Sequence, residues 1–361
     1  MSIPHFHTLK VIDIQKETST CVSVALEIPN DLKAEYTYKP GQYITIKKVI
    51  DGEELRRSYS LCSAPMEDDF RVAIKQVPDG RFSTFANQQL QVGDLLEVMT
   101  PMGNFTTDVS ASHKKNYMAF AAGSGITPIL SLAKTILHTE PQSTFTLVFG
   151  NQQFYSIIFR EAIETLKNKF IGRFQVFHIL SRERMESDLN FGRIDDVKCE
   201  QLFSKLIDFN RMDEYFMCGP EQMISNVKTY LLSKGVDVAK IHFELFTAEN
   251  SAKTKQAFQE SHAIDTKKVS MVTIKIDDRS IEIPLAYGGD TILDAALKQG
   301  ADLPFACKGG VCCTCRAKVI EGTVAMEVNY ALEKDEVANG FVLTCQAHPT
   351  SEKVVIDFDA R

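Results

Sequence analysis

Three cysteines share one short loop near the C-terminus of this 361-residue sequence, and a fourth follows at a distance. Cys307, Cys312 and Cys315 have the spacing C-x4-C-x2-C, and Cys345 lies 30 positions beyond Cys315. A [2Fe-2S] cluster needs two thiolates for each iron, and this is the plant-type spacing of its ligands. We therefore predict that these four cysteines are the metal ligands of a [2Fe-2S] cluster.

A structural zinc site is the alternative use of four thiolates. Zinc usually takes two short C-x2-C pairs, whereas here three sulfurs crowd one loop that contains Gly309 and Gly310. Glycines let the backbone approach inorganic sulfides and donate N–H groups to them. The spacing therefore favours the cluster. The adjacent Cys313 has no ligand position, and we interpret it as a small packed thiol.

A second group of chemically complementary residues, Arg57-Ser58-Tyr59-Ser60, ends a predicted strand. It offers a cation for a pyrophosphate, an aromatic ring for one face of an isoalloxazine and a hydroxyl for the N5/O4 edge of a flavin. An ordinary strand can also contain these residue types. Further along, Ser83 and Thr84 follow a predicted strand and precede a short helical stretch. We expect this pair to cap a helix whose free N–H groups face a phosphate, although a plain N-cap is the commoner meaning.

A glycine-containing turn follows the buried run Tyr117–Ala122. Gly123 and Gly125 permit a tight turn and the close approach of a pyrophosphate, as in dinucleotide-binding folds. Thr127 is expected to be the N-cap of the following helix, and Pro128 suits its first position. The sequence thus predicts a nicotinamide nucleotide site at this turn.

Ser181-Arg182 follows a later strand, and Arg193 lies a short distance beyond it. Two arginines beyond a sheet edge suit the 2′-phosphate of NADPH, because a ribose diol would favour an acidic residue. Surface arginines are also common without any such role. We favour NADPH over NADH on this pattern.

The order of these elements predicts a multidomain protein. Short alternating runs over residues 1–110 predict an antiparallel β-barrel, and buried runs alternating with helical stretches over 111–246 predict an α/β parallel-sheet domain. Residues 247–268 are polar and predict a linker. Residues 269–361 are predicted to form the third domain, an α+β ferredoxin domain of the β-grasp type.

Composition and charge exclude several classes of protein. Apolar residues at 44% and charged residues at 24% are ordinary globular values, and a net charge of −7 gives no basic face for a nucleic-acid partner. The start of the chain lacks a secretory signal, and the most apolar stretch is broken by glycines and a proline, so no membrane association is expected. Nine cysteines then indicate thiols or metal ligands in a cytoplasmic protein.

Residues 6–246 resemble the ferredoxin-NADP reductase superfamily in the order and spacing of these motifs. The resemblance implies that Tyr59 and Ser60 are catalytic residues beside the flavin, and that Cys218 lies beside the nicotinamide C4 from which hydride leaves. Cys218 could equally be a buried strand cysteine, and Phe246 could cover the flavin or belong to the core. The predicted cofactor-binding residues are Arg57, Ser58, Tyr59, Ser60, Ile74, Lys75, Phe82, Ser83, Thr84 and Phe246 for the flavin, and Gly123, Gly125, Thr127, Pro128, Ser181, Arg182, Arg193, Cys218, Gly219 and Pro220 for the nucleotide.

A closer resemblance covers nearly the whole chain. The stretches Phe6–Val11, Pro40–Gln42, Asp51–Arg57 and Cys307–Cys312 look like the reductase components of phenylacetyl-CoA epoxidases, the multicomponent di-iron oxygenases of phenylacetate degradation. This resemblance implies FAD, NADPH and delivery of electrons to di-iron oxygenase subunits. Two alternatives stay open: the reductase of another oxygenase or hydroxylase, including the phthalate type with FMN and NADH, and a non-enzymatic electron-carrier module.

Overall fold

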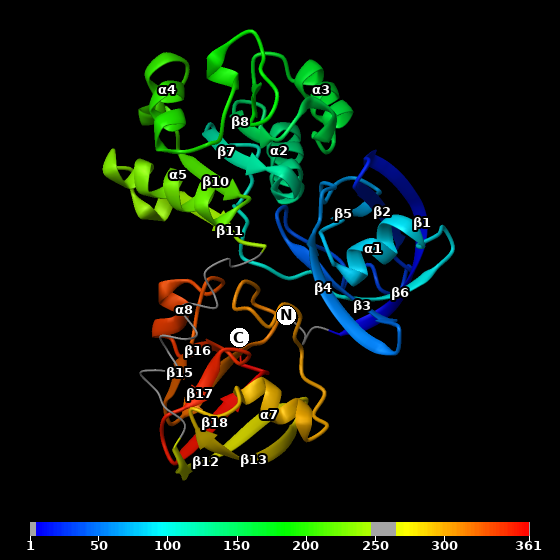
Figure 1. Cartoon of the computed structure of the whole chain (residues 1–361), viewed down its shortest axis with the longest axis vertical. Coiled ribbons are helices and arrows are strands. Elements are labelled where there is room, and N and C mark those ends of the chain that lie inside the picture. Colours follow the sequence, from blue (N-terminus) through cyan, green and yellow to red (C-terminus); the bar gives the residue numbers. More distant parts are fainter. Residues whose placement is uncertain (1–4, 247–264, 361) are drawn as a thin grey trace. The chain divides into compact units, whose positions relative to one another are not determined.

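The computed structural model describes residues 5–246 and 265–360. They form two compact units, one holding the two N-terminal sheets and the other the C-terminal sheets (Figure 1), and each is described by itself. The predicted fold class, a barrel-like sheet followed by a parallel sheet and a ferredoxin domain, is confirmed. The domain boundaries remain predictions.

The first sheet has six strands in the order β4-β3-β6-β1-β2-β5 and curls on itself (Figure 1). Its neighbours pair antiparallel in β1–β2, β1–β6, β2–β5 and β3–β6. In β1, Leu9 and Val11 are fully buried while Thr8 and Lys10 are exposed, as expected for a strand with one face toward a core. The elements are β1 (Phe6–Thr18), β2 (Cys21–Glu27), β3 (Tyr43–Ile50), β4 (Glu53–Ser60), β5 (Phe70–Lys75), α1 (Arg81–Gln88) and β6 (Leu95–Met99).

The second sheet is fully parallel, in the order β11-β10-β7-β8-β9. Helices cover both of its faces, because Tyr117 and Ala119 pack into the core beside α2 while Phe120 contacts Phe203 of α4 at 6.2 Å between ring centroids. The elements are β7 (Asn116–Ala122), α2 (Ile126–Thr139), β8 (Thr144–Asn151), α3 (Arg160–Lys169), β9 (Phe174–Leu180), α4 (Asp196–Lys205), β10 (Glu214–Cys218), α5 (Glu221–Ser233) and β11 (Ile241–Glu244).

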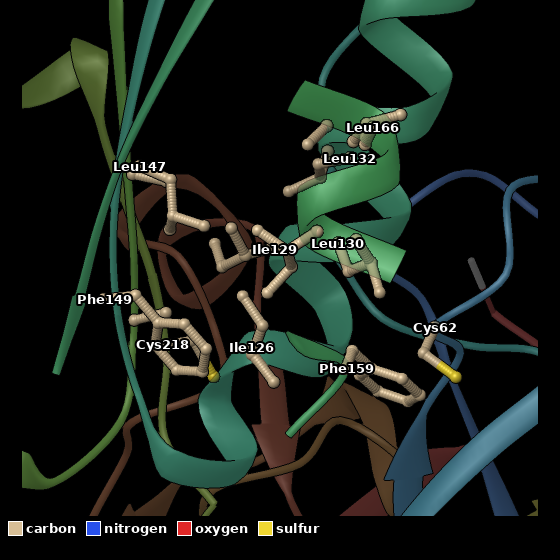
Figure 2. Close-up of a cluster of buried hydrophobic side chains, with 14 of the residues drawn as sticks. Cys62, Ile126, Ile129, Leu130, Leu132, Leu147, Phe149, Phe159, Leu166 and Cys218 are labelled. Atoms are coloured by element: carbon tan, nitrogen blue, oxygen red, sulfur yellow. The ribbon is translucent and has the colours of Figure 1, made fainter. Parts of the chain in front are cut away.

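The two sheets of this unit share one hydrophobic core. Ile126, Ile129 and Leu130 of α2 pack with Phe149 and with Cys62, which belongs to the first sheet's part of the chain (Figure 2).

Polar contacts reinforce this junction. The Ser131 hydroxyl donates to the carbonyl of Ser63 at 2.6 Å, and Lys134 pairs with Glu67 at 2.9 Å. Helix α2 is therefore fixed to the barrel as well as to its own sheet.

The C-terminal unit has a five-stranded sheet in the order β13-β12-β18-β14-β16 and a small β15-β17 sheet. Its first and last long strands, β12 and β18, pair parallel at the centre, which is the β-grasp arrangement. The predicted linker at 247–268 lies outside the described residues except for its last four, which belong to β12. The elements are β12 (Asp265–Ile276), β13 (Arg279–Tyr287), α7 (Ile292–Lys298), β14 (Arg316–Glu321), β15 (Val324–Met326), α8 (Lys334–Ala338), β16 (Phe341–Leu343), β17 (Ala347–Pro349) and β18 (Lys353–Asp357).

None of the helices in the described residues has both the length and the apolar character needed to cross a membrane.

Candidate functional site

The predicted flavin motif lies at the end of β4. Arg57 is exposed, Ser58 and Tyr59 are half-buried, and Ser60 is buried. The Tyr59 ring packs against the Phe82 ring of α1, with 5.7 Å between centroids and 33° between planes. Tyr59 thus has one supported face, as an aromatic platform for a flavin requires.

Helix α1 joins this strand to the end of β5. Asn87 donates to the carbonyl of Ile74 at 2.9 Å, and the Gln76 amide donates to the Thr84 hydroxyl at 3.3 Å. Ile74 and Phe82 are almost fully buried, so their side chains belong to the core and only their backbone remains for a cofactor.

The predicted capping role of Ser83 and Thr84 is wrong. Helix α1 begins at Arg81 with Gly80 as its N-cap, so both residues lie within the first turns. The Ser83 hydroxyl donates to the carbonyl of Gly80 and accepts from the N–H of Val77, which holds the turn before the helix. The helix starts earlier than predicted, because the extended backbone of Gly80 provides the N-cap without a side-chain hydrogen bond.

The glycine turn after β7 is a short 3₁₀ segment, η1 (Gly123–Gly125), that leads into α2. The N-cap of α2 is Gly125, so the predicted cap at Thr127 and the first helical position at Pro128 are both wrong by two residues. Thr127 instead donates its hydroxyl to the carbonyl of Ser124 at 3.0 Å. The turn is closed by this hydrogen bond rather than by a capping side chain.

Close backbone contacts define the nucleotide corner. A Cβ on Gly125 would lie 2.0 Å from the carbonyl oxygen of Cys218, and one on Gly219 would lie 3.2 Å from the backbone N of Ala122. Gly123 has a left-handed backbone (φ +55°), and the Lys75 Nζ lies 3.2 Å from its Cβ position. The glycine turn, the Cys218-Gly219 turn and an exposed lysine are thus brought together where α2 offers its free N–H groups to a phosphate.

An acidic residue completes this corner. Glu244 ends β11 directly beside Cys218 in the strand pairing, and the Ser60 hydroxyl donates to its carboxylate at 3.0 Å. Burial raises the pKa of Glu244 to about 8 and raises the pKa of the Cys218 thiol well above its usual range. A flavin-motif hydroxyl, a carboxyl group and a thiol therefore meet at one point.

Glu244 was not among the residues predicted from the sequence. The available signal was a single acidic residue at the end of the strand His242–Phe246, but pairing of that strand beside β10 is a long-range contact that the local pattern does not contain. Phe246, just beyond it, is partly exposed and Pro220 is the N-cap of α5.

The two predicted arginines lie beyond the carboxyl end of β9. Arg182 and Arg193 are both exposed, and within the described residues neither guanidinium has an ion pair or a hydrogen bond to a side chain. Ser181 is fixed by its backbone N–H, which donates to the carbonyl of Asn151 at 2.9 Å. This edge therefore offers two free cations near the end of β8.

The four predicted cluster ligands come together in the C-terminal unit. The Cys312 thiol donates to the Cys307 sulfur at 3.1 Å, and Cys345 hydrogen-bonds both Cys307 and Cys315. Within the described residues, no three His, Cys, Asp or Glu side chains are arranged around a single ion. The four cysteines are therefore brought together by contacts between their sulfurs, and they do not surround a position for one metal ion.

The surroundings of these sulfurs fit a [2Fe-2S] cluster. The N–H of Gly309 donates to the Cys307 sulfur at 3.3 Å, and hydrogen bonds from Cys312 and Cys345 hold the pKa of Cys307 well below its usual range. Gly310 has φ +74°, and a Cβ there would lie 2.8 Å from Val328. Four thiol donors, a glycine-tight loop and backbone N–H groups aimed at sulfur are what the cluster requires.

Three family models match consecutive parts of the chain. The oxidoreductase FAD-binding domain matches residues 9–107, the oxidoreductase NAD-binding domain matches 120–229, and the 2Fe-2S iron-sulfur cluster binding domain matches 274–350. The chain is also 45% identical over 356 residues to one of the subunits of the 1,2-phenylacetyl-CoA epoxidase of Escherichia coli (strain K12), covering 99% of this chain and 98% of that protein. The chain belongs to the family of this epoxidase subunit.

Other relatives serve different oxygenases. The chain is 31% identical to the ferredoxin reductase component of 3-ketosteroid-9-alpha-monooxygenase from Rhodococcus rhodochrous, over 97% of this chain and 96% of that protein. Among solved structures, phthalate dioxygenase reductase matches with a TM-score of 0.58 at 21% identity, covering 98% of both chains. At that identity the match shows a shared fold.

These matches confirm the predicted cofactor classes. The chain is an oxidoreductase with sites for FAD, a nicotinamide nucleotide and a [2Fe-2S] cluster. Its relatives are components of oxygenase systems.

Proposed function

We propose that the chain transfers electrons from NADPH to the di-iron oxygenase subunits of a multicomponent phenylacetyl-CoA epoxidase. The observation that carries this proposal is the 45% identity to the epoxidase component of E. coli along essentially the whole of both chains. In the overall reaction, one oxygen atom of O₂ enters the aromatic ring and the other leaves as water, which consumes two electrons and two protons. FAD, when bound, couples two-electron donors to one-electron acceptors such as a [2Fe-2S] cluster.

The chain's own residues divide this task. We assign the flavin to the β4 and α1 residues, with Tyr59 supporting the ring and Ser60 at its reactive edge. The nicotinamide half of the nucleotide is assigned to the corner of Gly125, Cys218 and Glu244. Gly125 and Cys218 are buried, and the Glu244 carboxyl group, whose pKa is raised to about 8, can hold a proton at neutral pH.

Two unpaired arginines support NADPH as the electron donor. A guanidinium binds a phosphate through paired hydrogen bonds, and Arg182 and Arg193 lie at the strand end where such proteins hold the adenosine ribose. Arg182→Ala should raise KM for NADPH about tenfold and leave KM for NADH within twofold. Arg184→Ala is the matched control, since Arg184 already pairs with Asp188 at 3.5 Å. An equal change for both coenzymes would remove the 2′-phosphate assignment.

The proposed domains are a FAD-binding barrel (1–110), a nucleotide domain (111–246), a linker (247–268) and a ferredoxin domain (269–361). We place the protein in the cytoplasm, where NADPH and oxygenase subunits are available. The linker would let the ferredoxin domain exchange between the flavin and an external acceptor.

The direct test is reconstitution. The purified chain is expected to release FAD on denaturation, to reduce cytochrome c with NADPH, and to support conversion of phenylacetyl-CoA to a product one oxygen heavier when the oxygenase subunits are added. Release of FMN, with NADH as the better donor, would instead indicate a phthalate-type reductase. Reduction of cytochrome c without turnover of phenylacetyl-CoA would show that the acceptor is a different oxygenase, as in the steroid monooxygenase relatives.

A further inference from the structure

The turn that connects β8 to α3 exposes two aromatic side chains. Phe154 is 46% exposed and Tyr155 is 66% exposed, whereas the next residues, Ile157 and Ile158, are almost fully buried. A 3₁₀ segment, η2 (Phe154–Ser156), carries both rings at the surface. The neighbouring apolar side chains are buried in the core, whereas these two rings remain at the surface. We therefore ask what the two rings could bind.

The turn is held in a defined conformation. Gln153 and Ser156 form a reciprocal capping box, and the N–H of Phe154 donates to the Glu183 carboxylate at 2.8 Å. The backbone N–H of Arg182 donates to the carbonyl of Gln152 at 2.9 Å. The turn after β8 is therefore locked to the turn after β9, which carries one of the two free arginines.

The position of this turn fits the far half of a dinucleotide. Gly150 of β8 pairs with Ala122 of β7, so the β8 turn lies next to the glycine turn along the carboxyl edge of the sheet. In open parallel sheets, nucleotides bind across this edge. A nucleotide with its pyrophosphate at Gly123–Gly125 would extend its adenosine toward β8 and β9.

A buried amide supplies an independent sign of a ligand. Asn151, the last residue of β8, is only 8% exposed, and within the described residues its Nδ2 has no hydrogen-bond acceptor. A buried donor without an acceptor is costly and rarely left unsatisfied in a native protein. An oxygen of a bound nucleotide would satisfy it.

The available chemistry matches adenosine. Adenine stacks on aromatic rings, and the Arg160 guanidinium backs the Phe154 ring at 4.7 Å from its centroid, leaving the more exposed Tyr155 ring as the platform. We propose that Tyr155 stacks on the adenine of the bound nucleotide and that the Asn151 amide donates to its ribose, an inference that rests on the proposed use of a nicotinamide dinucleotide.

This arrangement also gives Glu183 a role. An acidic residue just after β9 could select a ribose diol and oppose a 2′-phosphate. Here one of its carboxylate oxygens is engaged by the Phe154 backbone, so Glu183 acts as a positioning residue for the aromatic turn. Glu183→Gln, which keeps an oxygen acceptor, should preserve nucleotide affinity, whereas Glu183→Ala should weaken it.

The test uses nucleotide fragments that lack nicotinamide, so that its readout does not depend on turnover. Titration calorimetry of the FAD-loaded chain with 2′,5′-ADP and with 5′-AMP gives both dissociation constants. Tyr155→Ala should weaken both fragments about tenfold, within the range for loss of one base–aromatic stack, and Asn151→Ala should weaken both severalfold. Tyr155→Phe should stay within twofold of the natural chain, because the hydroxyl is not part of the stack.

Arg182→Ala distinguishes binding of the 2′-phosphate from binding of the adenine, since it should weaken the affinity for 2′,5′-ADP and not that for 5′-AMP. Circular dichroism and the FAD content of Tyr155→Ala, compared with those of the natural chain, verify that the variant is folded. Unchanged binding of both fragments by a folded Tyr155→Ala would overturn the adenine platform while leaving the proposed function intact. Failure of the natural chain to bind either fragment, together with no oxidation of NADPH or NADH, would overturn both.

Discussion

The nucleotide corner and the cysteine loop are built by different means. At the corner, backbone meets backbone: Gly125 ends the turn after β7, Cys218 ends the neighbouring strand β10, and the pairing of these strands brings the two residues into contact. At the cysteine loop, side chains meet: Cys312 and Cys345 both contact the Cys307 sulfur, and left-handed residues at Lys308 and Gly310 give the chain its path. The nucleotide corner is formed by the backbone fold itself. The cysteine site is complete only when its thiols bind a cluster.

The largest expected effect is loss of the cluster when one of its cysteine ligands is replaced. Cys345→Ser should abolish the visible absorption of the cluster, because the remote ligand cannot be replaced by a neighbouring residue. NADPH-driven reduction of ferricyanide, measured on the same variant, should persist because the reductase unit does not depend on this sulfur.

Cys313→Ser is the matched control for that substitution. Cys313 is buried beside two ligands but has no ligand position in the spacing, so the cluster absorption should remain. Bleaching of the Cys313 variant, or retention of the cluster in the Cys345 variant, would contradict the ligand assignment.

A smaller but still severe effect is expected at the nucleotide corner. Gly125→Ala places a Cβ 2.0 Å from a backbone oxygen that cannot move without displacing β10. We expect a loss of about 3 kcal/mol or more in the free energy of unfolding and at least a tenfold fall in NADPH oxidation. Urea denaturation and steady-state kinetics would measure these two quantities.

Gly150→Ala is the corresponding control in the same sheet. Its Cβ would come closest to the Cδ1 atom of Ile194, at 3.1 Å, and a side-chain end can rotate away, while Ala122 Cβ at 3.5 Å and Ala121 O at 3.6 Å are at ordinary contact distances. The cost should stay within about 1 kcal/mol. Equal losses in the two variants would show that the corner is no more rigid than the rest of the sheet edge.

The smallest effect concerns pH. The pKa of Glu244 is raised to about 8 from an ordinary 4.5 by burial, so its contribution to stability is fully present below pH 4.5 and is lost as the pH rises through 8. Glu244→Gln mimics the protonated form and should flatten the decline in unfolding free energy between pH 5 and 8.

The same substitution should remove any ionisation near pH 8 from the profile of NADPH oxidation. Ser60→Ala is the companion variant: the Ser60 hydrogen bond favours the charged carboxylate, so its loss should move that ionisation to higher pH. An ionisation near pH 8 that persists in Glu244→Gln would assign it to another group.

Local patterns were enough to predict many of the strands, whereas the four sulfur ligands stay a prediction. The buried run Tyr117–Ala122 lies within β7, which begins one residue earlier, at Asn116, and the cysteine spacing alone places Cys307, Cys312 and Cys315 in one short loop. The caps at Thr127 and Ser83 were predicted wrongly because glycines at the helix starts, Gly125 and Gly80, take the cap position without any side chain. Glu244 could not be found from the sequence, since its meeting with Ser60 spans 184 positions of the chain.

The shared core of the reductase unit has a consequence for folding. Helix α2 buries one surface against both the curled sheet and its own parallel sheet, with Cys62 and Phe149 in the same cluster (Figure 2). Neither sheet can lose its structure without exposing apolar surface of the other, so the two behave as one cooperative folding unit despite their separate topologies.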